Sequence, residues 1–280
     1  MRIKFEKLQA LGNDYIFIDC IRQRLGKINF PLLSKRICDR NFGVGSDGLI
    51  LIQRGRKTGF GMRMFNPDGS EAELCGNGVR CFARYIFESG LSSKKYQKVE
   101  TKKGIVETEI LSFSPDKFWI KVDMGIPILE ANKIPVKSKK RFFIQEKIKT
   151  GKKNVSVTCV NIGNPHTAVI VRDIPEDWKE IGSKIENSKN FPHRTNVEFV
   201  KVKSRNKIEL RVWERGAGAT LSSATGGCAA LVACVLAGKI ESEAEVSFER
   251  GNLKITWDKE KNHIFVEGPA ERVFSGVYEF

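Results

Sequence analysis

The chain has 280 residues, 41% of them hydrophobic and 29% charged, so it can bury a substantial core and disorder is not expected. It has no apolar run long enough to span a bilayer, and residues 1–6 read as the start of a strand and not as a signal peptide, so we expect a cytoplasmic protein. The net charge of +15 is spread along the chain and is densest over residues 137–153, which we interpret as a solvated strand–loop–strand edge. No nucleic-acid-binding motif accompanies this charge.

Most of the chain consists of short alternating runs that predict β-strands. Two segments with glycine-rich starts predict helices instead, over about 77–89 and 225–236. Because both contain small and apolar residues on all sides, we expect helices buried inside a β-rich shell. In chain order, the strand predictions cover residues 1–6, 15–19, 49–52, 61–65, 104–110, 118–124, 155–160, 167–171, 207–213 and 244–248.

An internal repeat becomes visible when Cys75 is aligned with Ser223. Asn66 and Glu214 each lie nine residues earlier, directly after an aromatic residue that ends a predicted strand. A glycine lies three residues after each aligned position, at the start of a predicted helix, and a Gly-Asn pair precedes each repeat at a similar distance. This constant order favours a duplication.

The repeat predicts an α+β fold of two pseudo-symmetric β/α lobes, each a curved sheet wrapped around a central helix. We place the N-terminal lobe at residues 1–124 and the C-terminal lobe at 125–269, with the switch near 123–128. The C-terminal strand, residues 270–280, is a candidate to cross back to the first lobe.

The seven cysteines are odd in number and form no paired CxxC sets, so neither a disulfide framework nor a structural zinc site is predicted. Three of them, Cys75, Cys81 and Cys228, lie in glycine-rich segments. The other four lie in apolar surroundings, where a small buried thiol is expected: Cys20, Cys38, Cys159 and Cys234.

Cys75 directly precedes Gly76-Asn77-Gly78, at the expected start of the first helix. Unpaired N–H groups at a helix N-terminus bind carboxylates and lower a thiol pKa from its usual value of about 8.5. A partly ionised thiol is a suitable general base for a carbon acid near neutral pH. The alternative is a small buried residue that caps the helix.

Ser223 lies at the corresponding place in the second half, before Ala224-Thr225-Gly226. If the two halves pack face to face, two helix N-termini converge on one substrate carboxylate, and Cys75 and Ser223 face opposite sides of its Cα. Racemisation needs this arrangement, because one group removes the Cα proton and another delivers a proton to the opposite face.

Six motifs occur along the chain: Leu11-Gly12-Asn13-Asp14, Asn66-Pro67-Asp68-Gly69-Ser70-Glu71, Cys75-Gly76-Asn77-Gly78, Gly163-Asn164-Pro165-His166, Asn196-Val197-Glu198-Phe199 and Glu214-Arg215-Gly216. Together they are specific, and the sequence resembles the diaminopimelate epimerase family over nearly its whole length. The resemblance implies two domains with the ligand in the cleft between them, and a cysteine pair acting as base and acid without cofactor or metal. It implies that Cys75 is one of the pair and that His166 and Glu214 are auxiliary acid–base residues.

The resemblance also implies which residues bind the substrate. Arg215 offers a bidentate fork for a carboxylate. For the asparagines, the alternative to substrate binding is turn formation beside glycine. For His166, the alternative to a functional role is an imidazole packed in the core. His193 and His263 lack such a context and are expected at the surface. Backbone donors to the α-carboxylate would come from Gly76, Asn77, Ala224 and Thr225, and the distal end of the substrate would be held by Asn13, Asn66, Asn164, Asn196 and Arg215.

The sequence departs from the family pattern at Ser223, where the family has its second cysteine, and at Ala219, where an acidic residue is common. An alkoxide is far harder to form than a thiolate, so Ser223 would be a poor base. Cys228 is expected more than a turn inside the helix, too far to replace the missing thiol. Because Ser222 and Ala224 also differ from the family run, natural divergence is favoured over an engineered Cys→Ser change.

The leading hypothesis is an isomerase that converts LL-diaminopimelate to the meso form, in lysine and cell-wall precursor synthesis. The alternatives are a dehydratase or lyase, another amino-acid racemase of the same fold, or a protein that binds the ligand without the chemistry. The expected partner is a small amino-acid substrate, with no nucleic acid and no membrane surface. A homodimer is the candidate oligomeric state.

Overall fold

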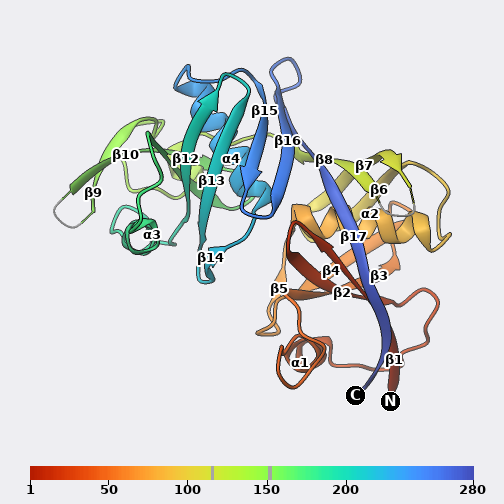
Figure 1. Cartoon of the computed structure of the whole chain (residues 1–280). Helices are drawn as coiled ribbons and strands as arrows, with labels where there is room; N and C mark the ends of the chain where they lie inside the picture. Colours follow the sequence, from red (N-terminus) through yellow and green to blue (C-terminus); the bar gives the residue numbers. More distant parts are fainter. Residues whose placement is uncertain (115–116, 151–152) are drawn as a thin grey trace. The chain divides into compact units, whose positions relative to one another are not determined.

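The computed structural model describes residues 1–114, 117–150 and 153–280, which form a mixed fold of mostly strands with four α-helices (Figure 1). The chain divides into two compact units, each described here by itself. Unit 1 comprises Met1–Val122 and Gly268–Phe280, and unit 2 comprises Asp123–Glu267. No helix among the described residues is long and apolar enough to cross a membrane.

Unit 1 is a strand-rich layer packed on a buried helix. The parallel pair β2–β3 is extended by β4 antiparallel to β3, and β6 then lies parallel to β4. Helix α2 contacts β1, β2 and β7. The elements are β1 (Arg2–Ala10), β2 (Asn13–Asp19), α1 (Phe30–Ile37), β3 (Gly48–Arg54), β4 (Phe60–Phe65), β5 (Glu71–Ala72), α2 (Gly76–Glu88), β6 (Tyr96–Thr101), β7 (Gly104–Phe113) and β8 (Phe118–Gly125), whose last residues belong to unit 2.

Unit 2 repeats these pairings: β11–β12 are parallel, β13 is antiparallel to β12, and β15 is parallel to β13. Helix α4 contacts β10, β11, β12, β13, β15 and β16, so it is the buried centre of the unit. The elements are η1 (Ala131–Lys133), β9 (Glu146–Thr150), β10 (Lys153–Asn161), β11 (Pro165–Val171), α3 (Trp178–Glu186), β12 (Asn196–Ser204), β13 (Lys207–Glu214), β14 (Gly218–Thr220), α4 (Ala224–Leu236), β15 (Glu243–Phe248), β16 (Gly251–Asp258) and β17 (His263–Glu279), which continues into unit 1.

The two units share one order of elements: β1-β2-α1-β3-β4-β5-α2-β6-β7-β8 in the first and β10-β11-α3-β12-β13-β14-α4-β15-β16-β17 in the second. Strand register makes the equivalence residue-specific. Tyr15 pairs with Gly48 between β2 and β3, and His166 pairs with Asn196 between β11 and β12. Tyr15 and His166 are therefore equivalent positions.

The register also aligns the two helix starts. Phe65 of β4 pairs with Glu71 of β5, and Trp213 of β13 pairs with Ala219 of β14. Cys75 lies four residues after Glu71, and Ser223 lies four residues after Ala219. The alignment of Cys75 with Ser223 thus follows from hydrogen-bonded pairs as well as from the sequence.

Each predicted strand coincides with an observed strand, and the two predicted helices correspond to α2 and α4. Helices α1 and α3 were not predicted. The basic stretch at 137–153 contains exposed residues followed by the antiparallel pair β9–β10, in agreement with the predicted strand–loop–strand edge, although residues 151–152 of that prediction lie outside the described part of the chain.

Candidate active site

In unit 1 the candidate site is built at the start of α2. Cys75 is the N-cap residue, with extended backbone angles (φ −136°, ψ 119°), and its side chain makes no capping hydrogen bond. Gly76 and Asn77, the first two helical residues, are buried. The first-turn N–H groups of a helix lack intrahelical acceptors, so this end suits a carboxylate.

Two side chains, Tyr15 and Asn13, lie against the Cys75 sulfur. The Tyr15 hydroxyl lies 2.9 Å from Cys75 Sγ and 2.6 Å from Asn13 Oδ1. Asn77 Nδ2 donates to the same Asn13 oxygen at 3.2 Å, while Asn13 Nδ2 donates to Asp47 at 2.7 Å. The Asn13 carbonyl therefore points toward the thiol, and Sγ itself lies 3.6 Å from it.

In unit 2 the corresponding position is Ser223, the N-cap residue of α4, with nearly the same backbone angles (φ −144°, ψ 117°). Its Oγ accepts a hydrogen bond from Gly226 N at 3.2 Å and lies 3.4 Å from the Thr225 hydroxyl. Ser223 therefore caps its helix, whereas the Cys75 side chain makes no capping bond to α2.

His166 and Glu198 form a buried pair on the parallel strands β11 and β12. Their Nδ1 and Oε1 atoms lie 2.7 Å apart, and His166 Nε2 lies 2.8 Å from Asn164 Oδ1. Burial raises the pKa of Glu198, while the positive form of His166 acts in the opposite direction. Glu198 Oε2 is buried without a hydrogen-bond partner among the described residues.

Glu214 ends β13 beside Ser223. Burial raises the pKa of Glu214, and His166 and the hydroxyls of Thr220 and Ser223 oppose this shift. A carboxyl group with a raised pKa holds its proton closer to neutral pH, so Glu214 can act as an acid near the helix start. Unit 2 thus places a carboxyl group with a raised pKa beside Ser223, whereas the neighbours of Cys75 in unit 1 are the Tyr15 hydroxyl and the Asn13 carbonyl.

The predicted substrate-binding asparagines differ in how they are held. Asn66 closes the turn after β4, with its Nδ2 donating to Ser70 Oγ at 2.9 Å. Asn196 is buried, donates to Pro165 O at 2.8 Å and accepts from the Arg215 backbone N–H at 2.9 Å. The exposed Arg215 guanidinium donates to His193 O at 3.2 Å. Their roles toward a substrate stay predictions.

Sequence reasoning did not single out Tyr15 or Glu198. Tyr15 reads as one more apolar strand residue, and Glu198 was noticed only as part of the Asn-Val-Glu-Phe motif. His263, expected at the surface, is half-buried, and its Nδ1 lies 2.7 Å from Asp123. Within residues 1–114, 117–150 and 153–280, no three His, Cys, Asp or Glu side chains are grouped so as to hold a metal ion.

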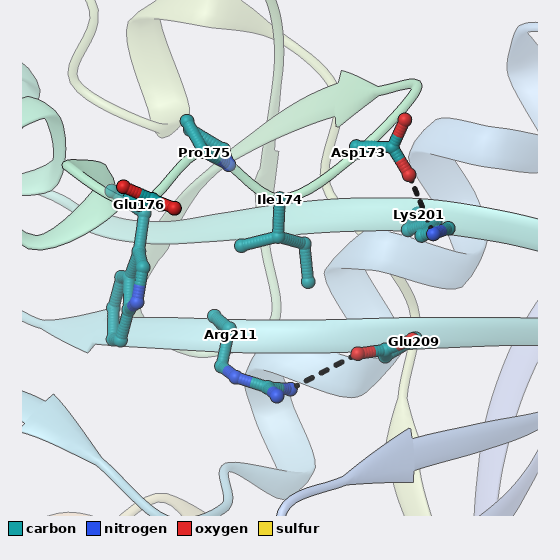
Figure 2. Close-up of a pocket in the computed structure, with 8 residues that line it drawn as sticks. Asp173, Ile174, Pro175, Glu176, Lys201, Glu209 and Arg211 are labelled. Carbon is teal, nitrogen blue, oxygen red and sulfur yellow. Dashed lines mark hydrogen bonds and ion pairs between the residues drawn. The ribbon is translucent and has the colours of Figure 1, made fainter.

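A separate cavity of about 490 Å³ lies in unit 2 (Figure 2). Four of its charged side chains are paired with one another, Lys201 with Asp173 at 2.6 Å and Arg211 with Glu209 at 3.4 Å. It contains none of the predicted site residues, so we assign the chemistry to the helix starts and not to this cavity. The lining residues are Asp173, Ile174, Pro175, Glu176, Trp178, Lys201, Glu209 and Arg211.

Solved structures of other proteins share the fold. A phenazine biosynthesis protein of the PhzF family from Bacillus anthracis matches with a TM-score of 0.72 at 17% identity, over 100% of both chains. A hydroxyproline epimerase from Agrobacterium vitis matches with a TM-score of 0.70 at 10% identity, over 99% of this chain and 91% of the other. Identities this low show the fold alone.

Sequence comparison identifies the family. The model of the diaminopimelate epimerase family matches residues 5–130 and 158–273. Diaminopimelate epimerases of Acetivibrio thermocellus and Methanococcus maripaludis are each 44% identical over 275 residues, covering 98% of this chain and 98% and 99% of their own. The chain belongs to the diaminopimelate epimerase family, which confirms the predicted resemblance and the prediction of an amino-acid epimerase.

Proposed function

We propose that the protein interconverts LL- and meso-diaminopimelate, with Cys75 removing the Cα proton from one face and the Ser223 side returning a proton to the other. The observation that carries this proposal is the equivalence of Cys75 and Ser223 as N-cap residues of two duplicated helices. The reaction requires both side chains to reach the same substrate Cα. This requirement corresponds to the site predicted from the sequence, between an N-terminal lobe at 1–124 and a C-terminal lobe at 125–269.

Cys75 is the better base of the two. A thiolate forms near neutral pH at a helix N-terminus, whereas a serine alkoxide does not. Unit 2 compensates with Glu214 and His166, which can supply a proton through or beside the Ser223 hydroxyl. After one turnover Cys75 is protonated and the acid of the second half is deprotonated, so exchange with solvent must reset both groups.

The substrate carboxylate would be held by backbone N–H groups at Gly76, Asn77, Ala224 and Thr225. The distal amino-acid end would be held by Asn13, Asn66, Asn164, Asn196 and Arg215. Asn13 also lies beside the thiol, with its carbonyl oxygen 3.6 Å from Cys75 Sγ. Assembly as a homodimer and a cytoplasmic location stay predictions. Size-exclusion chromatography with light scattering tests the first of these.

One alternative is favoured by a specific observation, namely the serine at position 223. A single working base would suffice for elimination from a hydroxylated amino acid, so a lyase or dehydratase is the second candidate. It would retain Cys75 as the base and would not need a proton donor on the opposite face.

Incubation with diaminopimelate in heavy water tests the proposal. Deuterium uptake at Cα with inversion supports it, uptake without inversion means one working face, and loss of ammonia or water means a lyase. Cys75→Ala should abolish uptake, because it removes the base, whereas Cys20→Ala, which removes a half-buried thiol of the same unit, should leave uptake unchanged. Exchange that persists in Cys75→Ala would show that the base is misassigned.

A further inference from the structure

The Tyr15 ring packs against two glycines. A Cβ atom on Gly48 would lie 3.3 Å from the ring, and one on Gly78 would lie 3.7 Å from it. Gly48 begins β3 and Gly78 lies in the first turn of α2, so the ring is packed between the sheet and the start of the helix. The side chain is buried, and this packing holds its hydroxyl at the Cys75 sulfur.

The hydroxyl has one proton and two acceptors within reach. Asn13 Oδ1 lies 2.6 Å away and Cys75 Sγ lies 2.9 Å away. While the thiol is neutral, the carbonyl of Asn13 is the stronger acceptor, and the S–H group can donate to the phenol oxygen. Once the thiol ionises, the sulfur carries a full negative charge and becomes the better acceptor.

We propose that Tyr15 is a positioning residue whose hydroxyl turns from Asn13 to Cys75 when the thiol loses its proton, and thereby stabilises the thiolate that acts as base. The inference rests on the proposed role of Cys75. No covalent bond to Tyr15 changes, because the thiol proton leaves to solvent and the phenol proton stays on its oxygen while its hydrogen bond changes direction.

The duplication supports this role. Tyr15 and His166 occupy equivalent positions in the strand register, and each half hydrogen-bonds its ring to a neighbouring side chain, Tyr15 to Asn13 and His166 to Glu198. A phenol hydroxyl is a neutral hydrogen-bond donor, whereas each imidazole nitrogen is a donor or an acceptor according to the tautomer. Tyr15 can therefore donate to the thiolate through its hydroxyl.

The test is the pH dependence of Cys75 alkylation by iodoacetamide in Tyr15→Phe, with Tyr85→Phe as the matched control. Tyr85 is a second buried tyrosine of unit 1, whose hydroxyl lies 3.3 Å from Asp19 and not at the sulfur. Modification is followed on the Cys75 peptide by mass spectrometry. Burial raises the pKa of Cys20 to about 11 and that of Cys81 to about 12, so neither should react near neutral pH.

We expect Tyr15→Phe to shift the alkylation profile to higher pH and to slow alkylation at neutral pH about tenfold, as loss of a hydrogen bond to a charged group predicts. Tyr85→Phe should follow the wild-type profile. In activity assays Tyr15→Phe should lower kcat with little change in KM, since Asn13 and the helix N–H groups remain. Coincident alkylation profiles for Tyr15→Phe and wild type would overturn the proposal.

Two further measurements keep the outcome decisive. If Tyr15→Phe does not fold, the ring-carbon NMR signal of isotope-labelled Tyr15 in the wild-type protein should move over the pH range in which Cys75 becomes reactive, and a signal unchanged over that range would overturn the proposal. Alkylation requires no turnover. A wild-type protein that fails to exchange the diaminopimelate proton would therefore refute the proposed function without deciding the role of Tyr15.

Discussion

Each replacement of one helix-start side chain by the other should change stability and activity in opposite directions. Ser223→Cys places a thiol where the second half now has a hydroxyl, and Cys75→Ser does the reverse in the first half. Because the two positions have nearly the same backbone angles, each replacement enters a geometry that already holds the other residue.

The magnitudes follow from the capping bonds. Ser223 Oγ accepts from Gly226 N at 3.2 Å, and a serine N-cap contributes about 1 kcal/mol to stability, within a range of about 0.5–2 kcal/mol. Sulfur is a weak acceptor, so Ser223→Cys should lose most of this contribution, as Ser223→Ala should. Cys75 makes no capping bond, so Cys75→Ser should gain about 0.5–1 kcal/mol.

The activity change should run the other way. A positioned acid–base group contributes about 10²–10⁴-fold to a proton transfer, so Ser223→Cys should raise the rate of inversion toward that range, while Ser223→Ala should not. Urea unfolding and deuterium uptake with chiral analysis measure the two effects on the same samples. A Ser223→Cys protein as stable as wild type, or one with no gain in inversion, would refute the reasoning from equivalent helix starts.

Two other perturbations probe the second half. Gly226→Ala should destabilise the protein by about 1–3 kcal/mol in urea unfolding, because its Cβ would lie 2.9 Å from Glu198 Oε1 and 3.1 Å from Ser223 Cβ. Gly78→Ala should destabilise it less, since the added Cβ meets the flexible end of Ile50. Equal losses of stability in the two variants would contradict this reasoning. The raised pKa of Glu198 means that its folded form keeps a proton that the unfolded form loses, so its contribution to stability is full below about pH 4.5 and falls as pH rises through the higher folded pKa. The unfolding free energy of Glu198→Gln relative to wild type should therefore be most favourable at higher pH. A difference in unfolding free energy that does not change with pH would contradict the raised pKa of Glu198.

The parts of the fold that the sequence predicts correctly are those with a local signal. Alternation marks the strands, and the glycine-rich starts of α2 and α4 mark two helices whose apolar composition requires burial. Helix α1 also carries local signals, an Asn29 N-cap and a proline in its first turn, but it has only eight residues and lies among irregular segments. Such short helices are stabilised mainly by packing, which one sequence does not display.

The sequence singles out candidate site residues where they adjoin a glycine-rich turn, and misses them where tertiary packing creates the contact. Cys75 and Ser223 are visible because helix starts are local features. Glu198 becomes important because parallel strands bring it to His166, 32 residues earlier in the chain, and Tyr15 because it reaches Cys75, 60 residues later. The first contact depends on the crossover between parallel strands and the second on how the start of α2 packs on β2, so no spacing rule in the sequence gives these pairs.

The residues near the two helix starts differ in a way that fits the different chemistry of Cys75 and Ser223. Ile50 and Glu198 are equivalent in register, and each lies 2.9 Å from the Cβ position of the corresponding helix glycine, Gly78 or Gly226. A buried carboxylate at position 50 would oppose ionisation of a nearby thiol, because like charges raise its pKa. An apolar residue at position 50 places no such charge beside the Cys75 thiol, whereas Glu198, whose pKa is raised by burial, can hold a proton near the start of α4. The same fold can therefore hold a base in one half and a proton reservoir in the other.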